Sequence, residues 1–349
     1  MPTPMEKSLG HVYWRELDGL RAVCIIFTIA NHTRGKYWFI NGTIGVDVFF
    51  ALSGFLITTL LIRERNKTGL ICLPCFYIRR FFRITPLYYL TVALYFPAVW
   101  IAWRATHDPR GLHNFGSALP WLLAFCSEFR PDEAGATFGH AWTLGIEEKY
   151  YIIWPLIFGS VAAISRTKLR LIMFLPLAIL WPYESMFRGY VALLCGSLLA
   201  FAVSTEGSRA HKIVMTTSTH VWFGAMSIGY LVTFVIPDHR TNLLISIPAT
   251  AFIAAITLKE RDVYKRLLST PGIWQLGTLT YAIYLCHRLV GHVVEQLFDK
   301  FHLRSGLGEF AVVYFMAVAV GYGLHRSVEM PFINFGKTLS DRAKKKGTV

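Results

Sequence analysis

The sequence predicts an all-α integral membrane protein, a polytopic bundle of about 10 transmembrane helices. Apolar residues make up 54% of the 349 residues and charged residues only 16%, whereas an average soluble domain is about 25% charged. A helix that crosses a bilayer needs roughly 20 mostly apolar residues. The composition excludes a disordered chain, a secreted disulfide scaffold and an ordinary cytosolic enzyme.

Apolar runs bounded by charged residues, Gly or Pro mark the expected spans. A further apolar stretch, 118–129, is only about a dozen residues long, which favours a re-entrant or interfacial segment over another crossing. The chain has no internal repeat or linker, so we expect 1–349 to form a single transmembrane domain with a short basic tail at about 336–349. The expected spans are 18–33, 44–62, 84–103, 142–164, 169–183, 189–204, 214–236, 242–258, 275–294 and 310–326.

The distribution of basic residues predicts the orientation of the chain. The net charge is +14, and cytoplasmic loops of membrane proteins collect Lys and Arg, so the charge does not require a nucleic-acid partner. When both termini are placed in the cytoplasm, roughly two thirds of the Lys and Arg residues fall in or beside cytoplasmic loops. We therefore expect a multi-pass protein whose two termini are both cytoplasmic.

Polar side chains inside the expected spans are the candidate functional residues, because a buried charge in a membrane usually faces a cavity or a partner. The first span carries Asn31 and His32 near its outer end, and the fourth carries Glu147 at a similar depth. A carboxylate that accepts from one imidazole nitrogen leaves the other nitrogen as a base. His32 and Glu147 are thus a candidate dyad for taking a proton from an attacking alcohol. The second span adds Asp47 and Ser53.

A second cluster of candidates is basic. Arg80 and Arg83 are three residues apart and share one face of a helix, with Arg79 beside them. Arginine binds phosphate oxygens bidentately, and Arg15 and Arg21 lie on the same side of the membrane, where they would extend a phosphate-binding surface. In an alternative interpretation these arginines only set the topology.

Two further local signals lie near this cluster. Pro86 is acceptable in the first turn of a helix, which places the arginines at the cytoplasmic mouth of the third span. Cys72 and Cys75 form a CxxC, but no second Cys or His pair stands at zinc-finger spacing, so we expect neither a redox role nor a metal ion. Neither a P-loop nor a Rossmann glycine motif occurs in the sequence.

Seven stretches together resemble the bacterial membrane acyltransferase family 3, an integral membrane O-acyltransferase family. Family members O-acylate surface polysaccharides, lipopolysaccharide, peptidoglycan, nodulation factors and some macrolides. Many carry a C-terminal esterase-like domain, which we expect this chain to lack. The stretches are RELDGLRAVCIIFTIANH (15–32), GVDVFFALSGFLIT (45–58), YIRRFFRITPLYYL (77–90), HAWTLGIEEKYYIIWP (140–155), FRGYVALLCGSLLA (187–200), LGTLTYAIYLCH (276–287) and VEMPF (328–332).

The resemblance implies roles for individual residues. His32 matches the family's essential histidine, its general base, and Glu147 matches the glutamate of its SLxxExxFY pattern. His287 is followed by Arg288 where an aromatic residue and a proline are usual, which leaves the role of His287 open. The remaining matches are Arg80 and Arg83 with the RxxR that serves the acyl donor, Arg15, Asp18 and Arg21 with the opening motif, and Arg188 and His287 with residues of the same type.

We therefore expect a membrane-bound O-acyltransferase of the bacterial inner membrane that moves an acyl group from cytoplasmic acyl-CoA to a hydroxyl. We expect the acyl group to be acetyl. The acceptor is a glycan, a lipid-linked sugar or a secondary metabolite, and membrane lipids are the other partners. The donor phosphates would bind the arginines, and His32, oriented by Glu147, would deprotonate the acceptor. Asn31, Tyr88 and Trp142 are candidates for stabilising the oxyanion. The supporting pocket is expected to contain Asp18, Asn31, Asp47, Ser53, Tyr88, Trp142, Glu148, Arg188 and His287.

A proton-coupled secondary transporter or exporter is the alternative function. His32, Asp47 and Glu147 would then form a proton relay, because ionisable groups inside a membrane are equally expected there. The residues alone do not decide between the two, but paired inverted repeats are not visible and the resemblance favours the enzyme. Direct attack and passage through an acyl-histidine both remain open.

Overall fold

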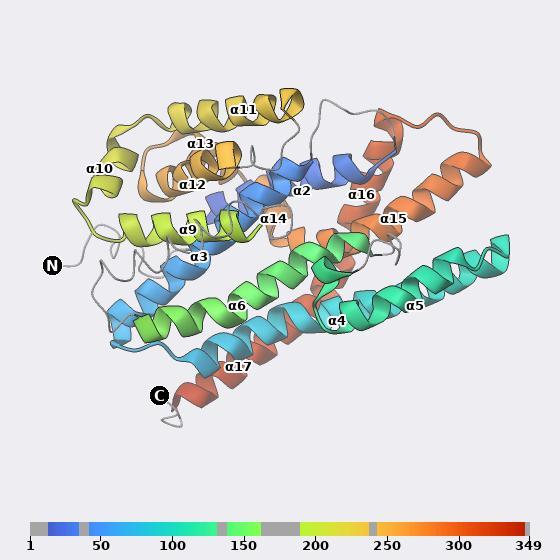
Figure 1. Ribbon diagram of the computed structural model, residues 1–349, viewed down its shortest axis with the longest axis horizontal. Helices are drawn as coiled ribbons and strands as arrows, with labels where there is room; N and C mark the ends of the chain where they lie inside the picture. Colours follow the sequence, from blue (N-terminus) through green and yellow to red (C-terminus); the bar gives the residue numbers. More distant parts are fainter. Residues whose placement is uncertain (1–12, 35–41, 131–137, 162–188, 237–242, 346–349) are drawn as a thin grey trace. The chain divides into compact units, whose positions relative to one another are not determined.

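A computed structural model describes residues 13–34, 42–130, 138–161, 189–236 and 243–345 (Figure 1). Within these ranges the secondary structure is helical and no strand occurs, which confirms the all-α prediction. The expected span at 169–183 lies outside the described residues. The helices gather into two compact units, and each unit has a hydrophobic core of its own.

Unit 1 consists of Met1–Thr28, Phe39–Ile71 and Ile153–Thr278. Its core gathers buried residues such as Trp14, Leu52, Phe55 and Phe252. Its helices are the first part of α2 (Arg15–His32), α3 (Thr43–Thr68), α9 (Tyr190–Val203), α10 (Arg209–Thr216), α11 (Thr219–Val235), α12 (Leu243–Leu258), α13 (Val263–Leu268) and α14 (Ile273–Thr278).

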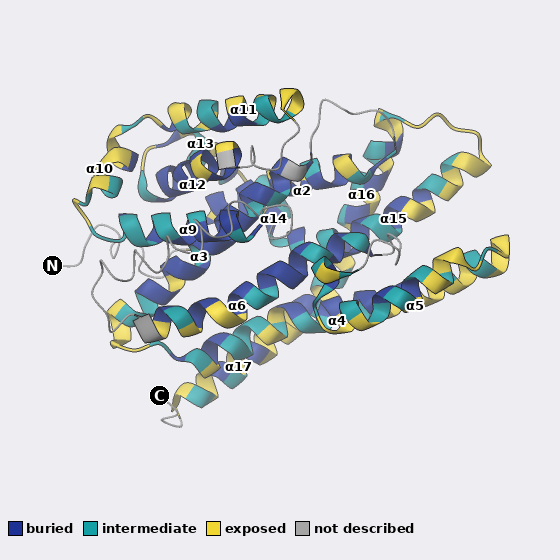
Figure 2. Ribbon diagram, viewed as in Figure 1, coloured by how far each residue is buried: buried dark blue, intermediate teal, exposed yellow. Residues whose placement is uncertain are grey.

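Small residues allow α3 and α9 to pack closely in unit 1. A Cβ atom added at Gly54 would collide with the carbonyl oxygen of Leu193, and one added at Gly196 would collide with that of Ala51. The Ser197 hydroxyl donates to the carbonyl oxygen of Gly54 at 3.0 Å. Small residues and hydroxyl groups of this kind hold helices together in membranes. The helix α12 packs on α3, α9 and α11 and is buried along most of its length (Figure 2).

Unit 2 consists of Ile29–Trp38, Cys72–Ile152 and Leu279–Val349. The helices α4 and α17 pack along each other, as do α15 and α16, and α15 also contacts α4. Its elements are the end of α2, α4 (Leu73–Thr106), α5 (Arg110–Leu123), η1 (Ser127–Phe129), η3 (Gly139–Ala141), most of α6 (Trp142–Val161), α15 (Thr280–Lys300), α16 (Leu307–Leu324), the π-helix η6 (His325–Glu329) and α17 (Met330–Lys345).

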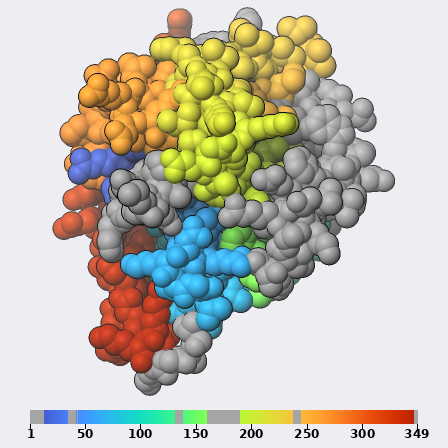
Figure 3. All heavy atoms as spheres, turned by 90° about the vertical axis from the view of Figure 1, so that its left-hand side faces the viewer, coloured from blue at the N-terminus to red at the C-terminus, as the bar shows by residue number. Residues whose placement is uncertain are grey.

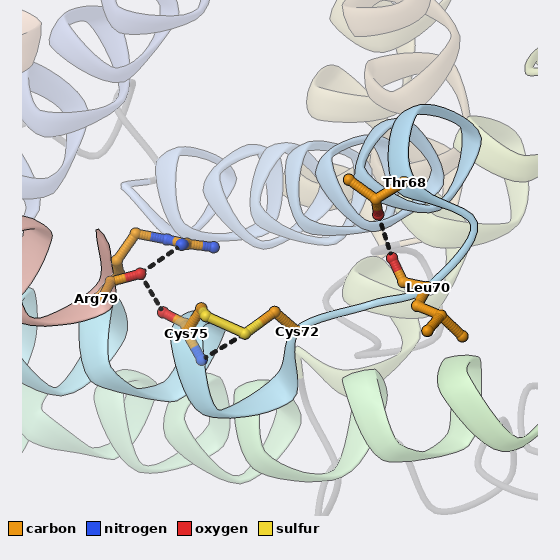
Figure 4. The surroundings of a disulfide bond; sticks show 6 residues. Thr68, Leu70, Cys72, Cys75 and Arg79 are labelled. Atoms are coloured by element: carbon orange, nitrogen blue, oxygen red, sulfur yellow. Dashed lines mark hydrogen bonds between the residues drawn. A yellow bond between two sulfur atoms is a disulfide. The ribbon is translucent and has the colours of Figure 1, made fainter. Parts of the chain in front are cut away.

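The third expected span begins earlier than predicted. The helix α4 starts at Leu73, so Pro86 lies inside it, and the interpretation of Pro86 as a helix-start residue is wrong. The start is instead marked by Pro74 in the first turn and by Cys72, whose sulfur accepts from the backbone N–H of Cys75 at 3.3 Å. Cys72 and Cys75 also form a disulfide, a bond that the sequence analysis did not expect (Figure 4).

Other boundaries shift as well. The stretch 118–129 divides between the end of α5 and η1, and α5, with 14 residues, is too short to cross a bilayer. The expected span 214–236 divides into α10 and α11. The last helix continues from α16 through η6 and α17, so the expected tail from 336 is helical as far as 345.

Among the described residues, three helical segments are long and apolar enough to cross a membrane by length and composition: Ile44–Thr68, Leu73–Thr106 and Leu307–Lys345. Three shorter apolar helices are Tyr190–Val203, Thr219–Val235 and Leu244–Leu258. These helices are consistent with a helical membrane protein, and the number of crossings, about ten, stays a prediction.

Candidate active site

The candidate base His32 contacts a second histidine in unit 2. His32 is the last residue of α2 and is half-buried, whereas His287, on α15, is buried. His32 Nδ1 lies 3.3 Å from His287 Nε2, and the two ring centroids are 5.0 Å apart. The residues are 255 positions apart in the sequence, so only the packing of α15 beside the end of α2 brings them together.

The hydrogen bonds of His287 determine which nitrogen of His32 carries the proton when both rings are neutral. His287 Nδ1 lies 2.6 Å from the carbonyl oxygen of Tyr284. A carbonyl oxygen only accepts, so Nδ1 of His287 donates and its Nε2 carries the lone pair. Nε2 then accepts from Nδ1–H of His32, and the lone pair of His32 lies on its own Nε2. This arrangement makes Nε2 of His32 the basic nitrogen.

A third histidine, His140, completes the cluster. Its ring centroid lies 4.7 Å from that of His287 and 6.2 Å from that of His32, and the side chain is buried. The sequence analysis did not select His140, although the residue stands two positions before Trp142 in one of the stretches that carry the resemblance.

Tyr284 connects this cluster to the start of α6. Its hydroxyl donates to the carbonyl oxygen of His140 at 2.7 Å and lies 2.5 Å from the hydroxyl of Thr143. Its own carbonyl oxygen accepts from His287. A single residue therefore fixes His287, the main chain at His140 and the first turn of α6.

Glu147, the predicted orienting carboxylate, is buried on α6 four residues after Thr143 and shares a helix face with it. Glu147 interacts electrostatically with Tyr284, and its role as a direct partner of His32 stays a prediction. The neighbouring residue, Glu148, interacts electrostatically with Glu147 and with Arg80.

Two arginines hold the end of α2. Arg288 donates to the carbonyl oxygen of His32 at 3.0 Å. Arg34 pairs with Asp299 at 2.9 Å and with the buried Glu309 at 3.3 Å, and it donates to the carbonyl oxygen of Glu295 at 2.9 Å. The hydrogen bond to Asp299 is the main reason why the pKa of Arg34 is raised. These bonds attach the His32 end of α2 to α15 and α16.

The arginines of α4 have different environments. Arg79 donates to the hydroxyl of Ser340 on α17 at 2.8 Å, and that hydroxyl donates to the carbonyl oxygen of Cys75 (Figure 4). Arg80 lies over the ring of Tyr151 at 4.7 Å. Arg83 is exposed, and within the described residues it has no ion-pair partner.

The position of the arginines relative to the histidines follows from one contact. The Tyr281 hydroxyl donates to the carbonyl oxygen of Ile84, the residue after Arg83, at 2.6 Å. Tyr281 precedes His287 by six residues on α15, which corresponds to about 9 Å along the helix axis. Arg83 and His287 therefore lie on two helices of unit 2, α4 and α15, that contact each other.

All three oxyanion candidates lie among the described residues. Tyr88 is fully buried and donates its hydroxyl proton to the carbonyl oxygen of Leu122 at 2.9 Å. This proton is therefore not available to an oxyanion while that hydrogen bond is in place. Trp142 is half-buried at the first position of α6, and Asn31 is exposed one residue before His32.

The remaining predicted residues belong to unit 1. Asp18 and Arg21 form an ion pair of 2.5 Å on α2, and Arg15 lies over the ring of Trp274 at 5.1 Å. Asp47 and Ser53 are buried on α3. Arg188 lies outside the described residues.

A family model described as an acyltransferase domain matches residues 14–326 of the chain. The chain belongs to this acyltransferase family. The match covers His32, His140 and His287 as well as the arginines of α4, so the family relationship extends over the whole candidate site. It confirms the resemblance on which the sequence analysis relied.

Named relatives agree with the family. A Staphylococcus aureus protein called "putative O-acetyltransferase" is 28% identical over 94% of this chain and 59% of its own length. The peptidoglycan O-acetyltransferase OatA of Listeria monocytogenes is 29% identical over 79% of this chain and 49% of its own length. The O-acetyltransferase OatA of S. aureus is 28% identical over 81% of this chain and 51% of its own length. The chain thus spans about half to three fifths of these relatives, and no solved structure matches it.

Proposed function

We propose that this acyltransferase-family chain is a membrane O-acetyltransferase in which His32 is the general base and His287 positions it. The observation that carries the proposal is the 3.3 Å contact between Nδ1 of His32 and Nε2 of His287, which directs the lone pair of Nε2 of His32 away from the pair. A base positioned in this way contributes about 10²–10⁴-fold to the rate.

The proposed reaction is acyl transfer from acetyl-CoA to a hydroxyl. Nε2 of His32 takes the hydroxyl proton while the hydroxyl oxygen forms a bond to the thioester carbonyl carbon. The carbon–sulfur bond breaks, and the coenzyme A thiolate takes the proton back from His32. Products are the acetyl ester and free coenzyme A, and the imidazole is regenerated.

The donor would bind through its phosphates to Arg83 and Arg80. Support comes from the exposure of Arg83 and from the position of both arginines along the helix pair that carries His287. Guanidinium groups bind phosphate oxygens bidentately. An extended pantetheine arm would then run along α15 towards His32.

The acceptor is proposed to be a glycan hydroxyl. One relative is named a peptidoglycan O-acetyltransferase, and two others are named O-acetyltransferases. The family match also favours transfer over proton-coupled transport, the alternative function of the sequence analysis.

The decisive experiment compares membranes that contain wild type, His32→Ala or His113→Ala, each supplied with labelled acetyl-CoA. His113 is an exposed histidine on α5 and serves as the matched control. We expect His32→Ala to lose at least about 10²-fold in transfer and His113→Ala to match wild type. Thermal stabilisation by desulfo-CoA should persist in His32→Ala. Undiminished transfer in His32→Ala would reject the proposal.

The donor site has a separate test. Arg83→Lys keeps the charge and loses the bidentate fork, so we expect a higher KM for acetyl-CoA with a smaller change in kcat. A KM equal to that of wild type would assign the arginines to topology alone.

A further inference from the structure

A second basic feature lies in unit 1, apart from the residues used above. Trp14, just before α2, and Arg63, on the last turns of α3, form a stacked pair in which the guanidinium carbon lies 4.1 Å from the ring centroid. Trp14 is only 6% exposed and belongs to the core of unit 1. The stack holds the guanidinium in a fixed position.

The pair leaves three buried donors unused. Nε and Nη2 of Arg63 and Nε1 of Trp14 are buried, and among the described residues none of them has a hydrogen-bond partner. Buried polar atoms in proteins are nearly always paired, and leaving one unpaired costs free energy. All three atoms are donors, so the missing partner is an acceptor.

The nearby carboxylates are engaged elsewhere. Glu16 pairs with Lys265 at 3.4 Å, and Asp18 pairs with Arg21 at 2.5 Å. Across the described chain no carboxylate lies within 4.0 Å of Arg63. The adjoining residue, Arg15, lies over Trp274, whose Nε1 is also buried without a partner among the described residues. Arg63 and Arg15 thus each lie over a tryptophan ring, and neither forms an ion pair with a carboxylate of the described residues.

The unused atoms match one ligand chemistry. Nε and Nη2 form one edge of the guanidinium, the edge that binds two oxygens of an anion at once. A phosphoryl group offers several acceptor oxygens and no obligatory donor, so it can also accept from Nε1 of Trp14. We infer that Trp14 and Arg63 form a phosphoryl-binding site. Figure 3 shows one face of the molecule, on which light-blue atoms, the colour of the end of α3 and of the start of α4, are visible.

Two sources supply phosphoryl groups at a membrane: an anionic lipid headgroup and the phosphates of coenzyme A. The lipid source is independent of the proposed function, whereas the coenzyme A source rests on it. Both share the chemistry that the site recognises, so binding is measured first with a small probe and then with each source.

The first measurement is the Kd of inorganic pyrophosphate for the detergent-purified full chain at constant ionic strength. We expect Arg63→Gln to weaken binding about 10- to 100-fold, the range for a hydrogen-bonded charged group, and Trp14→Phe about 3- to 10-fold. Trp14→Phe keeps the ring under the guanidinium and removes only the N–H. Arg63→Lys, which keeps the charge without the fork, should fall between wild type and Arg63→Gln.

Lys67→Gln is the matched control, because Lys67 is exposed on the same helix and its loss removes the same charge. It should bind pyrophosphate as wild type does. An unchanged Kd in Arg63→Gln, or equal losses in Lys67→Gln and Arg63→Gln, would overturn the inference.

The second measurement separates the sources. If coenzyme A stabilises the wild type and Arg63→Gln weakens this effect, the site binds the donor. If the wild type is more stable in phosphatidylglycerol than in phosphatidylcholine nanodiscs and Arg63→Gln abolishes the difference, the site binds lipid. If Arg63→Gln changes the stabilisation by neither source, that result counts against the site. Acetyl transfer is assayed separately, so an inactive chain that still binds pyrophosphate through Arg63 refutes the proposed function and leaves this site standing.

Discussion

At the scale of single residues, the base strength available at His32 depends on the proton held by its neighbour. His287 presents a lone pair to His32 only while the carbonyl oxygen of Tyr284 keeps the His287 proton on Nδ1. In the proposed mechanism His287 is thus a positioning residue, since it acts through His32. The departure from the family pattern at Arg288 also has a structural use, because Arg288 holds the main chain of His32.

We predict that His287→Phe lowers kcat for acetyl transfer by at least about tenfold, part of the 10²–10⁴-fold that a positioned base contributes. The substitution removes the acceptor for Nδ1–H of His32 and frees the imidazole to adopt the other tautomer. His287→Gln should recover part of the rate, because its amide oxygen accepts the same hydrogen bond. Steady-state kinetics with both variants check this, and equal rates for the Phe and Gln variants would contradict the positioning role.

At the scale of elements, the end of α2 is held by ion pairs of unequal burial. Glu309 is fully buried against Arg34, whereas Asp299 is largely exposed. A buried charge whose partner is removed is strongly destabilising, while an exposed ion pair contributes little. The Arg34–Glu309 ion pair therefore fixes α16 to the chain two residues beyond the end of α2.

We predict that Arg34→Gln lowers the free energy of unfolding, because it leaves the buried carboxylate of Glu309 without a partner. The loss should be at most about 3–5 kcal/mol, the cost of an uncompensated buried charge, because Arg34 itself is partly exposed. Adding Glu309→Gln should restore most of the loss because the buried charge disappears. Denaturant unfolding in detergent measures both. The matched control is Arg110→Gln, which breaks the exposed pair with Asp108 and should leave the unfolding midpoint at that of wild type.

The contact between α3 and α9 makes a second prediction at this scale. Gly54→Ala places a Cβ atom against the carbonyl oxygen of Leu193, and overpacking of this kind costs about 1–3 kcal/mol. Gly224→Ala, on α11, meets open space and should be neutral or slightly stabilising. The midpoint of thermal unfolding should fall in the first variant only. A similar midpoint in both would show that the helices separate to accept the methyl group.

At the scale of the whole molecule, the asymmetry of Lys and Arg predicts that both termini are cytoplasmic. In a cysteine-free background, Arg304→Cys, between α15 and α16, should react with an impermeant maleimide in intact cells. Lys345→Cys, near the end of α17, should react only after permeabilisation. Both positions are exposed, so their access to the reagent is matched. Labelling of Lys345→Cys from outside would reverse the topology.

Local physics explains which features could be predicted from the sequence. The all-α class follows from the abundance of apolar residues, because a bilayer leaves the backbone few alternatives to the helix. His32 was recognisable because polar groups are costly in apolar segments. Arg83 was recognisable because it shares a helix face with Arg80 and because arginine binds phosphate bidentately. The start of α4 was misplaced because Pro86 is compatible with a first turn, and only packing along α17 shows that the helix continues through it.

The sequence by itself determined the membrane class, the family and the identity of the candidate base, since these depend on composition and on residues within short stretches. Only the tertiary structure decided what lies beside that base. His287 and His140 are 255 and 108 positions from His32, and no local pattern encodes the packing of α15 beside the end of α2. Hydrogen bonds act over about 3 Å, so the partner of His32 is determined by the fold.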